Sequence, residues 1–146
     1  MKPFRFRLER VLAWRRTELE LEQYKMRLLC AGLEEIERSR ARLTAERVVA
    51  EREILGARRI DGADLNIHAA RLYYLDERER ALLRRRHEQE ERIAEAHKGL
   101  LEAQRRLRLL GKLKASRHAH WEAELNRELE AFAAETHLAR WNADRP

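Results

Sequence analysis

The chain has 146 residues, of which 40% are charged, 44% hydrophobic and 6% aromatic, and its formal net charge is +6 at pH 7. Arginine, glutamate, leucine and alanine dominate, which is typical of long helices and coiled coils. This composition argues against a globular core with an enclosed pocket. The single cysteine, Cys30, excludes an internal disulfide and is expected to be a small packing residue.

No apolar run approaches the roughly 20 residues that a helix needs to cross a bilayer. The first eight residues are too charged and too interrupted for a signal peptide. We therefore expect a cytoplasmic protein with no direct membrane insertion.

Heptad spacing predicts a first helix over residues 4–55. Polar residues such as Arg15, Glu22, Arg40 and Arg47 interrupt its seam, where they could set register or mark loose packing. The repeat favours a supercoiled seam over a globular amphipathic helix. The apolar members of its two seam positions are Leu8, Leu12, Leu19, Met26, Leu29, Leu33, Ile36, Leu43, Ala50 and Ile54.

Residues 56–64 are expected to form a turn, because they hold two glycines and two aspartates between stretches with almost no helix breaker. Gly56 can end the first helix in a left-handed conformation. Either Asp61 or Asp64 can cap the next helix by accepting a backbone N–H bond. The pattern predicts the bend of a helical hairpin.

Heptads resume in a second helix predicted over residues 65–140. Folding the chain about residue 60 is expected to bring Arg40 near Glu79, as an ion pair that would specify register more than add stability. The predicted fold is all-α, with residues 1–146 forming one long antiparallel two-helix coiled-coil hairpin. The second helix is longer and extends beyond the first.

Pairing of the two helices is expected to end near residue 115. The second helix then continues alone with an apolar stripe, and exposed apolar stripes usually mark a partner. The alternatives are self-association and a frayed tail. We call this stripe the C-terminal overhang; its expected binding residues are Trp121, Leu125, Leu129 and Phe132.

The charged residues in the most unusual stretch of the sequence are all basic, since no acidic residue occurs between Glu102 and Glu122. The hairpin would place the basic N-terminus at the same open end. A solvated face is the plain explanation, and docking on an acidic surface is the functional one. We call this set the basic surface; its members are Arg5, Arg7, Arg10, Arg105, Arg106, Arg108, Lys112, Lys114 and Arg117.

Catalytic and metal-binding patterns are missing from the sequence. His118 and His120 are two residues apart and face different directions on a helix. The sequence contains no glycine-rich phosphate loop, serine elbow or paired-cysteine motif. We expect a non-enzyme without cofactor or metal.

Three stretches resemble the FliJ family, a group of small cytosolic components of the bacterial flagellar type III export apparatus related to YscO-type stalk proteins. The first runs from Phe4 to Arg15 and has the pattern aromatic-x-aromatic-x-Leu followed by Val-Leu and Arg. In the second, Gly62 is followed by Tyr74-Leu75. The third is the basic leucine-lysine segment from Arg108 to Arg117.

The resemblance implies a hairpin similar to the central stalk of rotary ATPases, which binds the hexameric export ATPase through its open end. It also implies contacts with substrate chaperones and with the cytosolic domain of the export-gate membrane protein, at a location peripheral to the inner membrane. Arg78 stands where the family usually has leucine. The positions matching the family's gate contact, which we call the gate surface, are Tyr74, Arg78, Ala81 and Arg85.

Two other functions remain open at this point. A basic coiled coil could bind nucleic acid or ribosomes, although aromatic residues do not interleave with basic ones along the sequence as single-strand binders need, and we expect no DNA partner. A plain structural coiled coil with a homodimeric seam is the third, and the choice between monomer and dimer stays open.

Overall fold

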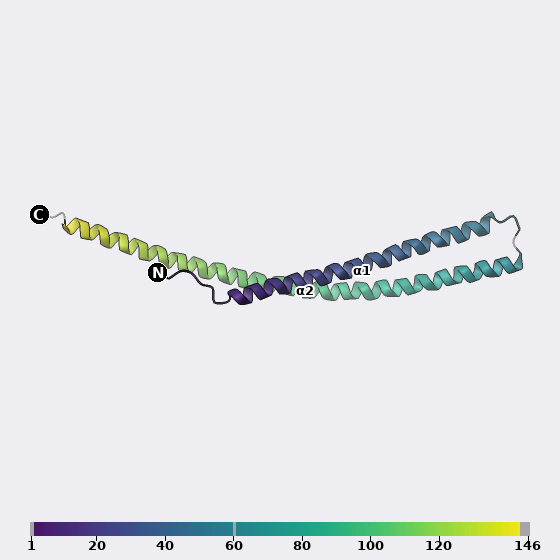
Figure 1. Ribbon diagram of the computed structural model, residues 1–146, viewed down its shortest axis with the longest axis horizontal. Helices are drawn as coiled ribbons and strands as arrows, with labels where there is room; N and C mark the ends of the chain where they lie inside the picture. Colours follow the sequence, from purple (N-terminus) through teal and green to yellow (C-terminus); the bar gives the residue numbers. More distant parts are fainter. Residues whose placement is uncertain (1, 60, 144–146) are drawn as a thin grey trace. The chain divides into compact units, whose positions relative to one another are not determined.

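The computed structural model describes residues 2–59 and 61–143 of the chain. Over these residues the protein is all-α: helix α1 spans Glu9–Gly56 and helix α2 spans Gly62–Ala143 (Figure 1). The helices pack against each other as a hairpin, and α2, with 82 residues, is longer than α1, with 48. The predicted fold class is confirmed.

The turn is shorter than the predicted residues 56–64. The Asp61 carboxylate accepts the Gly62 N–H at 2.6 Å, and the Asp61 carbonyl accepts the Leu65 N–H at 3.0 Å. Asp61 therefore starts α2, while Asp64 lies inside its first turn. Ile60 lies outside the described residues.

The expected left-handed Gly56 is wrong, because no described glycine has a positive φ. Helix α1 instead closes with a tighter bond, in which the Ala57 N–H donates to the Ile54 carbonyl at 3.4 Å. Such three-residue bonds commonly satisfy the last carbonyls of a helix.

Packing divides the chain into two units. Unit 1 comprises residues 1–20 and 102–146, and unit 2 comprises residues 21–101. No described stretch of either helix is long and apolar enough to cross a membrane.

Unit 2 has a narrow apolar core near the turn. Leu43 and Ala50 of α1 and Leu75 and Leu82 of α2 are buried together, with Leu72 packed against them. These residues occupy heptad positions, as the sequence predicts. No polar or charged side chain is buried among the described residues, so this core is formed by apolar side chains alone.

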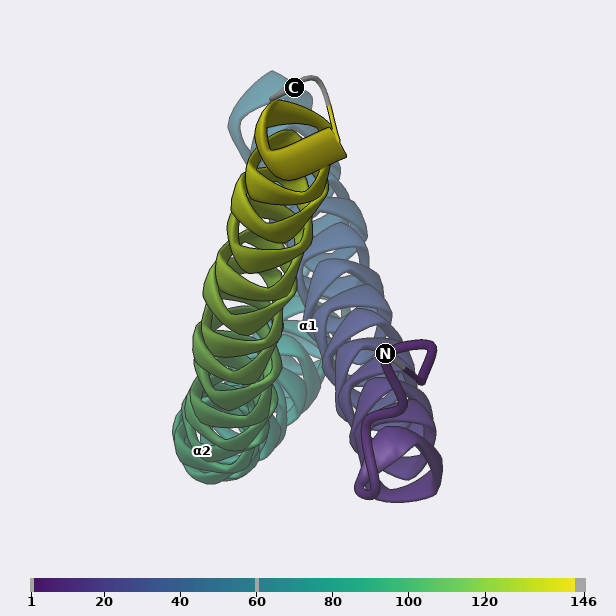
Figure 2. The ribbon, with the colours of Figure 1, turned by 90° about the vertical axis from the view of Figure 1, so that its left-hand side faces the viewer.

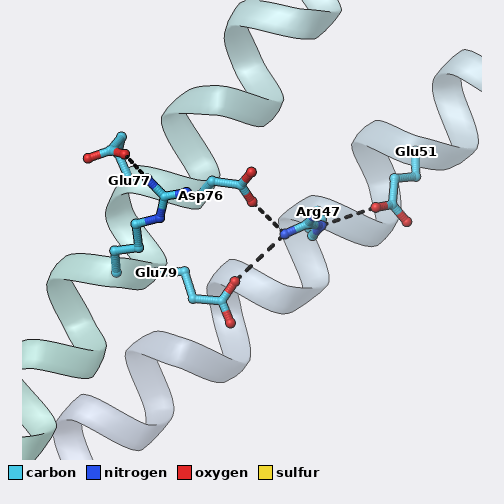
Figure 3. A network of polar contacts seen from close by, with 6 residues as sticks. Arg47, Glu51, Asp76, Glu77 and Glu79 are labelled. Carbon is cyan, nitrogen blue, oxygen red and sulfur yellow. Dashed lines mark hydrogen bonds and ion pairs between the residues drawn. The ribbon is translucent and has the colours of Figure 1, made fainter.

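Arg47 ties the two helices of unit 2 together. Its guanidinium reaches Asp76 at 2.6 Å and Glu79 at 3.7 Å on α2, and Glu51 at 3.1 Å on α1 (Figure 3). The hydrogen bond with Glu51 and the negative charge of Asp76 raise the pKa of Arg47 above its ordinary value. Two further pairs, Arg71–Glu53 at 2.7 Å and Arg86–Glu37 at 2.9 Å, cross between the helices.

The predicted Arg40–Glu79 ion pair is wrong. Arg40 binds Glu37 on its own helix at 3.2 Å, and Glu79 lies beside Arg47. The pairing register differs by a few residues from a fold centred on residue 60, since Arg47 lies about two helical turns closer to the bend than Arg40.

Two seam polar residues sit over glycines of the facing helix. The Gln89 amide donates to the Leu29 carbonyl at 2.7 Å, and a Cβ added at Gly32 would lie 2.8 Å from the same amide nitrogen. Likewise a Cβ at Gly99 would lie 3.2 Å from a Glu22 carboxylate oxygen. Glycine thus makes room for polar side chains in a seam that otherwise selects apolar ones.

In unit 1 the first helix begins later than predicted. Residues 4–8 are not helical, and the Glu9 N–H donates to the Phe6 carbonyl at 3.1 Å. Figure 2 shows this N-terminal segment as a purple trace without helical turns ahead of α1. Phe6 is buried although it lies outside the helix, and Leu12 on α1 and Ala103 on α2 are buried as well. Burial of aromatic rings competes here with helix extension.

The core of unit 2 generates a first prediction. Replacing the buried Leu82 by alanine should lower the free energy of unfolding by about 2–3 kcal/mol, because the substitution removes buried methyl groups and leaves a cavity. Leu83, its exposed neighbour, is the matched control, and Leu83→Ala should cost less than about 0.5 kcal/mol. Urea unfolding followed by helical circular dichroism measures both, and equal losses would contradict the observed seam.

The glycines give a second prediction. A methyl group added at Gly111 would meet open space, so Gly111→Ala should stabilise the protein by up to about 1 kcal/mol through helix propensity. Gly32→Ala should fall short of that gain, because the new methyl group displaces the Gln89 amide. Adding Gln89→Ala should recover the difference, and urea midpoints compare the variants. A full gain from Gly32→Ala alone would argue against the Gln89 contact.

Candidate functional site

The basic surface is assembled in unit 1 from two distant parts of the sequence. Arg5 and Arg7 lie in the N-terminal segment and Arg10 in the first turn of α1, while the remaining members lie on α2. An ion pair between Lys114 and Glu9 at 2.8 Å joins the two parts. The structure therefore brings the predicted N-terminal and C-terminal cations into one unit.

Two members of the basic surface are neutralised by ion pairs, each with at least one acid that is distant in the sequence. Arg106 contacts Glu102 at 3.0 Å and Glu18 at 3.5 Å, and Lys114 contacts Glu9. Their side chains hold the N-terminal part of α1 against α2. The expectation that they face a partner as free cations is not supported by these contacts.

The other members keep their charge uncompensated. Among the described residues, no acidic side chain lies within 4.0 Å of any of them, and all are exposed. Closely spaced charges of one sign create a positive potential that attracts anionic partners and weakens with salt. These free cations are Arg5, Arg7, Arg10, Arg105, Arg108, Lys112 and Arg117.

An aromatic cluster lies at the edge of the basic surface. The Phe4 ring lies edge-on to His118, with centroids 4.9 Å apart, and tilted to Trp121 at 6.0 Å. The Trp121 indole N–H donates to the Lys2 carbonyl at 3.1 Å. A shallow hollow between these groups is lined by Lys2, Arg5 and the Phe4 and Trp121 rings.

This cluster changes the expected extent of the overhang. Trp121 is half-buried under the N-terminal segment, so α2 stays covered to residue 121 and not only to residue 115. The contact was not predicted from the sequence, although the aromatic residues of the N-terminus were a signal for it, since large rings are rarely left in water when an apolar neighbour is within reach.

The overhang beyond Trp121 remains an apolar stripe on α2. Leu125 is half-buried, while Leu129 and Phe132 are exposed. Their spacing of four and three residues places them on one face of the helix. Two of the four predicted overhang residues, Leu129 and Phe132, are therefore exposed, and Leu125 is exposed in part.

The gate surface lies in unit 2 on α2. Tyr74, Arg78 and Arg85 are exposed, and Ala81 is half-buried. The Arg78 guanidinium donates to the Tyr74 hydroxyl at 3.0 Å, and its central carbon lies 5.8 Å from the ring centroid. The two side chains form one wall of a shallow hollow that Ser39 and Glu46 of α1 also line.

The described residues contain no group of three or more histidine, cysteine, aspartate or glutamate side chains that could hold a metal ion. His118 and Glu122 approach to 3.4 Å and His87 and Glu91 to 3.3 Å, each pair within one turn of α2. Cys30 is exposed and unpaired; the packing role expected for it is not supported. Open hollows lie along the two helices, among them one lined by Glu22, Lys25 and Arg92.

Comparison with known proteins adds no relative. No family model matches the chain, and neither the curated proteins nor the solved structures contain a match.

Proposed function

We propose that the protein is a non-enzymatic coupling stalk of the bacterial flagellar type III export apparatus. In this role it is cytoplasmic and peripheral to the inner membrane, and its basic surface docks on the acidic opening of the hexameric export ATPase. The resemblance of its N-terminal and leucine-lysine segments to the FliJ family supports this assignment, together with the hairpin of two unequal helices.

The observation that carries the proposal is the set of seven free cations in unit 1. Arg47 and Arg86 of unit 2 sit beside carboxylates of the facing helix, whereas these seven cations follow closely on one another in two short stretches of unit 1. A cluster that the fold leaves uncompensated costs electrostatic repulsion, and an anionic partner removes that cost. Complementary charge of this kind speeds association and selects orientation more than it raises affinity.

The two remaining surfaces fit secondary contacts of such a stalk. The gate surface around Tyr74 and Arg78 is the candidate contact for the cytosolic domain of the export-gate membrane protein. The overhang residues Leu125, Leu129 and Phe132 offer an apolar helix face to substrate chaperones. Neither contact involves a cofactor.

One observation favours a second candidate function, the binding of nucleic acid or ribosomes. Phe4 and Phe6 alternate with Arg5 and Arg7 in the N-terminal segment, and the fold brings Trp121 beside Lys2 and Arg5. Rings next to cations are what single-stranded nucleic acid recognises through stacking and phosphate contacts. Charge reversal combined with RNA binding separates the two functions.

The test reverses the charge of three free cations in the full-length protein, with Arg105, Arg108 and Lys112 each changed to glutamate. Arg106 is left intact because its ion pairs hold α1 against α2. This variant should lose activation of a flagellar export ATPase in a coupled phosphate-release assay, while its helical circular dichroism stays unchanged.

A matched control carries the same change of charge on unit 2. Arg52, Arg84 and Arg92 are exposed and have no acidic side chain within 4.0 Å among the described residues. Their reversal to glutamate should leave activation intact. If both variants lost ATPase activation, the effect would come from net charge and not from the basic surface. If neither lost activation, docking through the basic surface would be refuted. Tight binding to single-stranded RNA that falls steeply with salt would promote the second candidate.

A further inference from the structure

Helix α1 carries a second apolar stripe that α2 does not cover. Trp14, Leu21 and Leu28 follow one another at intervals of seven residues and are 57%, 56% and 55% exposed. Three residues further on from each lie Thr17, Tyr24 and Ala31, all exposed. These six residues, which we call the outer seam, fill consecutive a and d positions of a heptad repeat.

The outer seam lies opposite the seam that faces α2. Because α1 is continuous over Glu9–Gly56, the helical repeat alone decides which of its residues share a face. Leu12, Leu19 and Met26, which are buried or half-buried, fall roughly half a turn away from Trp14, Leu21 and Leu28. A helix in a two-helix hairpin needs only one apolar stripe, so the second one indicates another helix.

We propose that the occupant of the outer seam is a second copy of the chain, with the two α1 helices packed antiparallel across a two-fold axis. In that arrangement a positions face d positions of the partner helix. Trp14 then faces Ala31 of the second copy, Thr17 faces Leu28, and Leu21 faces Tyr24. A large side chain meets a small one at the ends, which suits close packing.

The Thr17 hydroxyl and the Trp14 ring, at one end of the outer seam, can be covered by a second helix. The Thr17 hydroxyl donates to the Ala13 carbonyl within α1 at 3.3 Å, so burying it leaves no unpaired donor. The Arg15 guanidinium carbon lies over the Trp14 ring, 4.5 Å from its centroid, and Trp14 is still 57% exposed.

Charge beside the outer seam is self-complementary. Glu20 and Arg27 are exposed on the same flank, and neither has an ion-pair partner among the described residues. Antiparallel pairing in the register above brings Glu20 of each copy opposite Arg27 of the other, which makes two symmetric ion pairs. On the other flank Lys25 already binds Glu22 at 2.7 Å, so the pairing rests on Glu20 and Arg27.

The same charges disfavour the neighbouring registers. A shift of one heptad in one direction places Arg27 of one copy opposite Arg27 of the other. A shift in the opposite direction places the two copies of Glu20 opposite each other. Like charges facing each other across a coiled coil are repulsive. Stripe and charges therefore select one antiparallel arrangement.

This dimer does not depend on the proposed function. Its residues are distinct from the seven free cations, so the two proposals fail in different variants. The reversal of Arg105, Arg108 and Lys112 tests ATPase docking and leaves the outer seam unchanged.

The experiment measures mass in solution by sedimentation equilibrium of the full chain over a wide range of concentrations. The mass should rise from the 17.5 kDa of one chain toward twice that value. Glu20→Arg and Arg27→Glu should each raise the dimer dissociation constant about tenfold, through repulsion at two symmetric sites. The double reversal Glu20→Arg with Arg27→Glu should restore the original value.

Two further variants separate the seam from general stickiness. Leu21→Gln with Leu28→Gln should abolish the dimer while helicity is retained, since glutamine is a good helix former. Leu101→Gln with Leu109→Gln, which changes leucines of similar exposure on α2, should leave the dimer intact. A monomer at every concentration would overturn the proposal. A dissociation constant that rises with Glu20→Arg but not with Arg27→Glu would also overturn it. That result would indicate parallel helices, which place Glu20 beside Lys25 of the second copy and leave Arg27 unpaired.

Discussion

A helix with a single neighbour can bury only one stripe of its surface, and that limit governs this protein. The buried residues are few, and they are drawn from seam positions such as Leu43 and Ala50 on α1 and Leu75 and Leu82 on α2. Everything outside the stripe meets water unless a partner covers it. Stability, register and binding must therefore all be arranged along two helices that have almost no interior.

Because the seam supplies little apolar burial, polar groups take over the selection of register. Arg47 bridges to Asp76 and Glu79, and Gln89 reaches across to the Leu29 carbonyl above Gly32. Such contacts add modest stability at an exposed surface. They matter because a shifted register breaks several of them at once, whereas an apolar heptad repeat alone tolerates a shift of one heptad.

Ion pairs between the two helices are spread unevenly among the cations of this protein. In unit 2 several arginines find a carboxylate on the facing helix. In unit 1 only Arg106 and Lys114 of the basic surface do so among the described residues, and the N-terminal segment adds further cations to an already positive face. Aromatic contacts from Phe4 to His118 and Trp121 hold that segment on α2 despite the repulsion. The fold thus uses ring contacts to concentrate positive charge in unit 1.

The sequence by itself determined the helices, the bend and the heptad seam, because these depend on local repeats and on the near-absence of helix breakers. It also determined which residues could form the basic surface. Only the tertiary structure decided which of those cations stay free. Glu9 and Glu18 lie near the start of α1, about 90 to 105 residues before Arg106 and Lys114 in the sequence, and the hairpin brings Glu9 to Lys114 and Glu18 to Arg106. The Arg40–Glu79 pairing failed for the same reason: a register is set by all contacts between two helices together, and spacing along one chain does not contain it. Nor could spacing reveal that Phe4 and Phe6 leave the helix to cover α2, because the apolar pattern of those residues also fits one more helical turn.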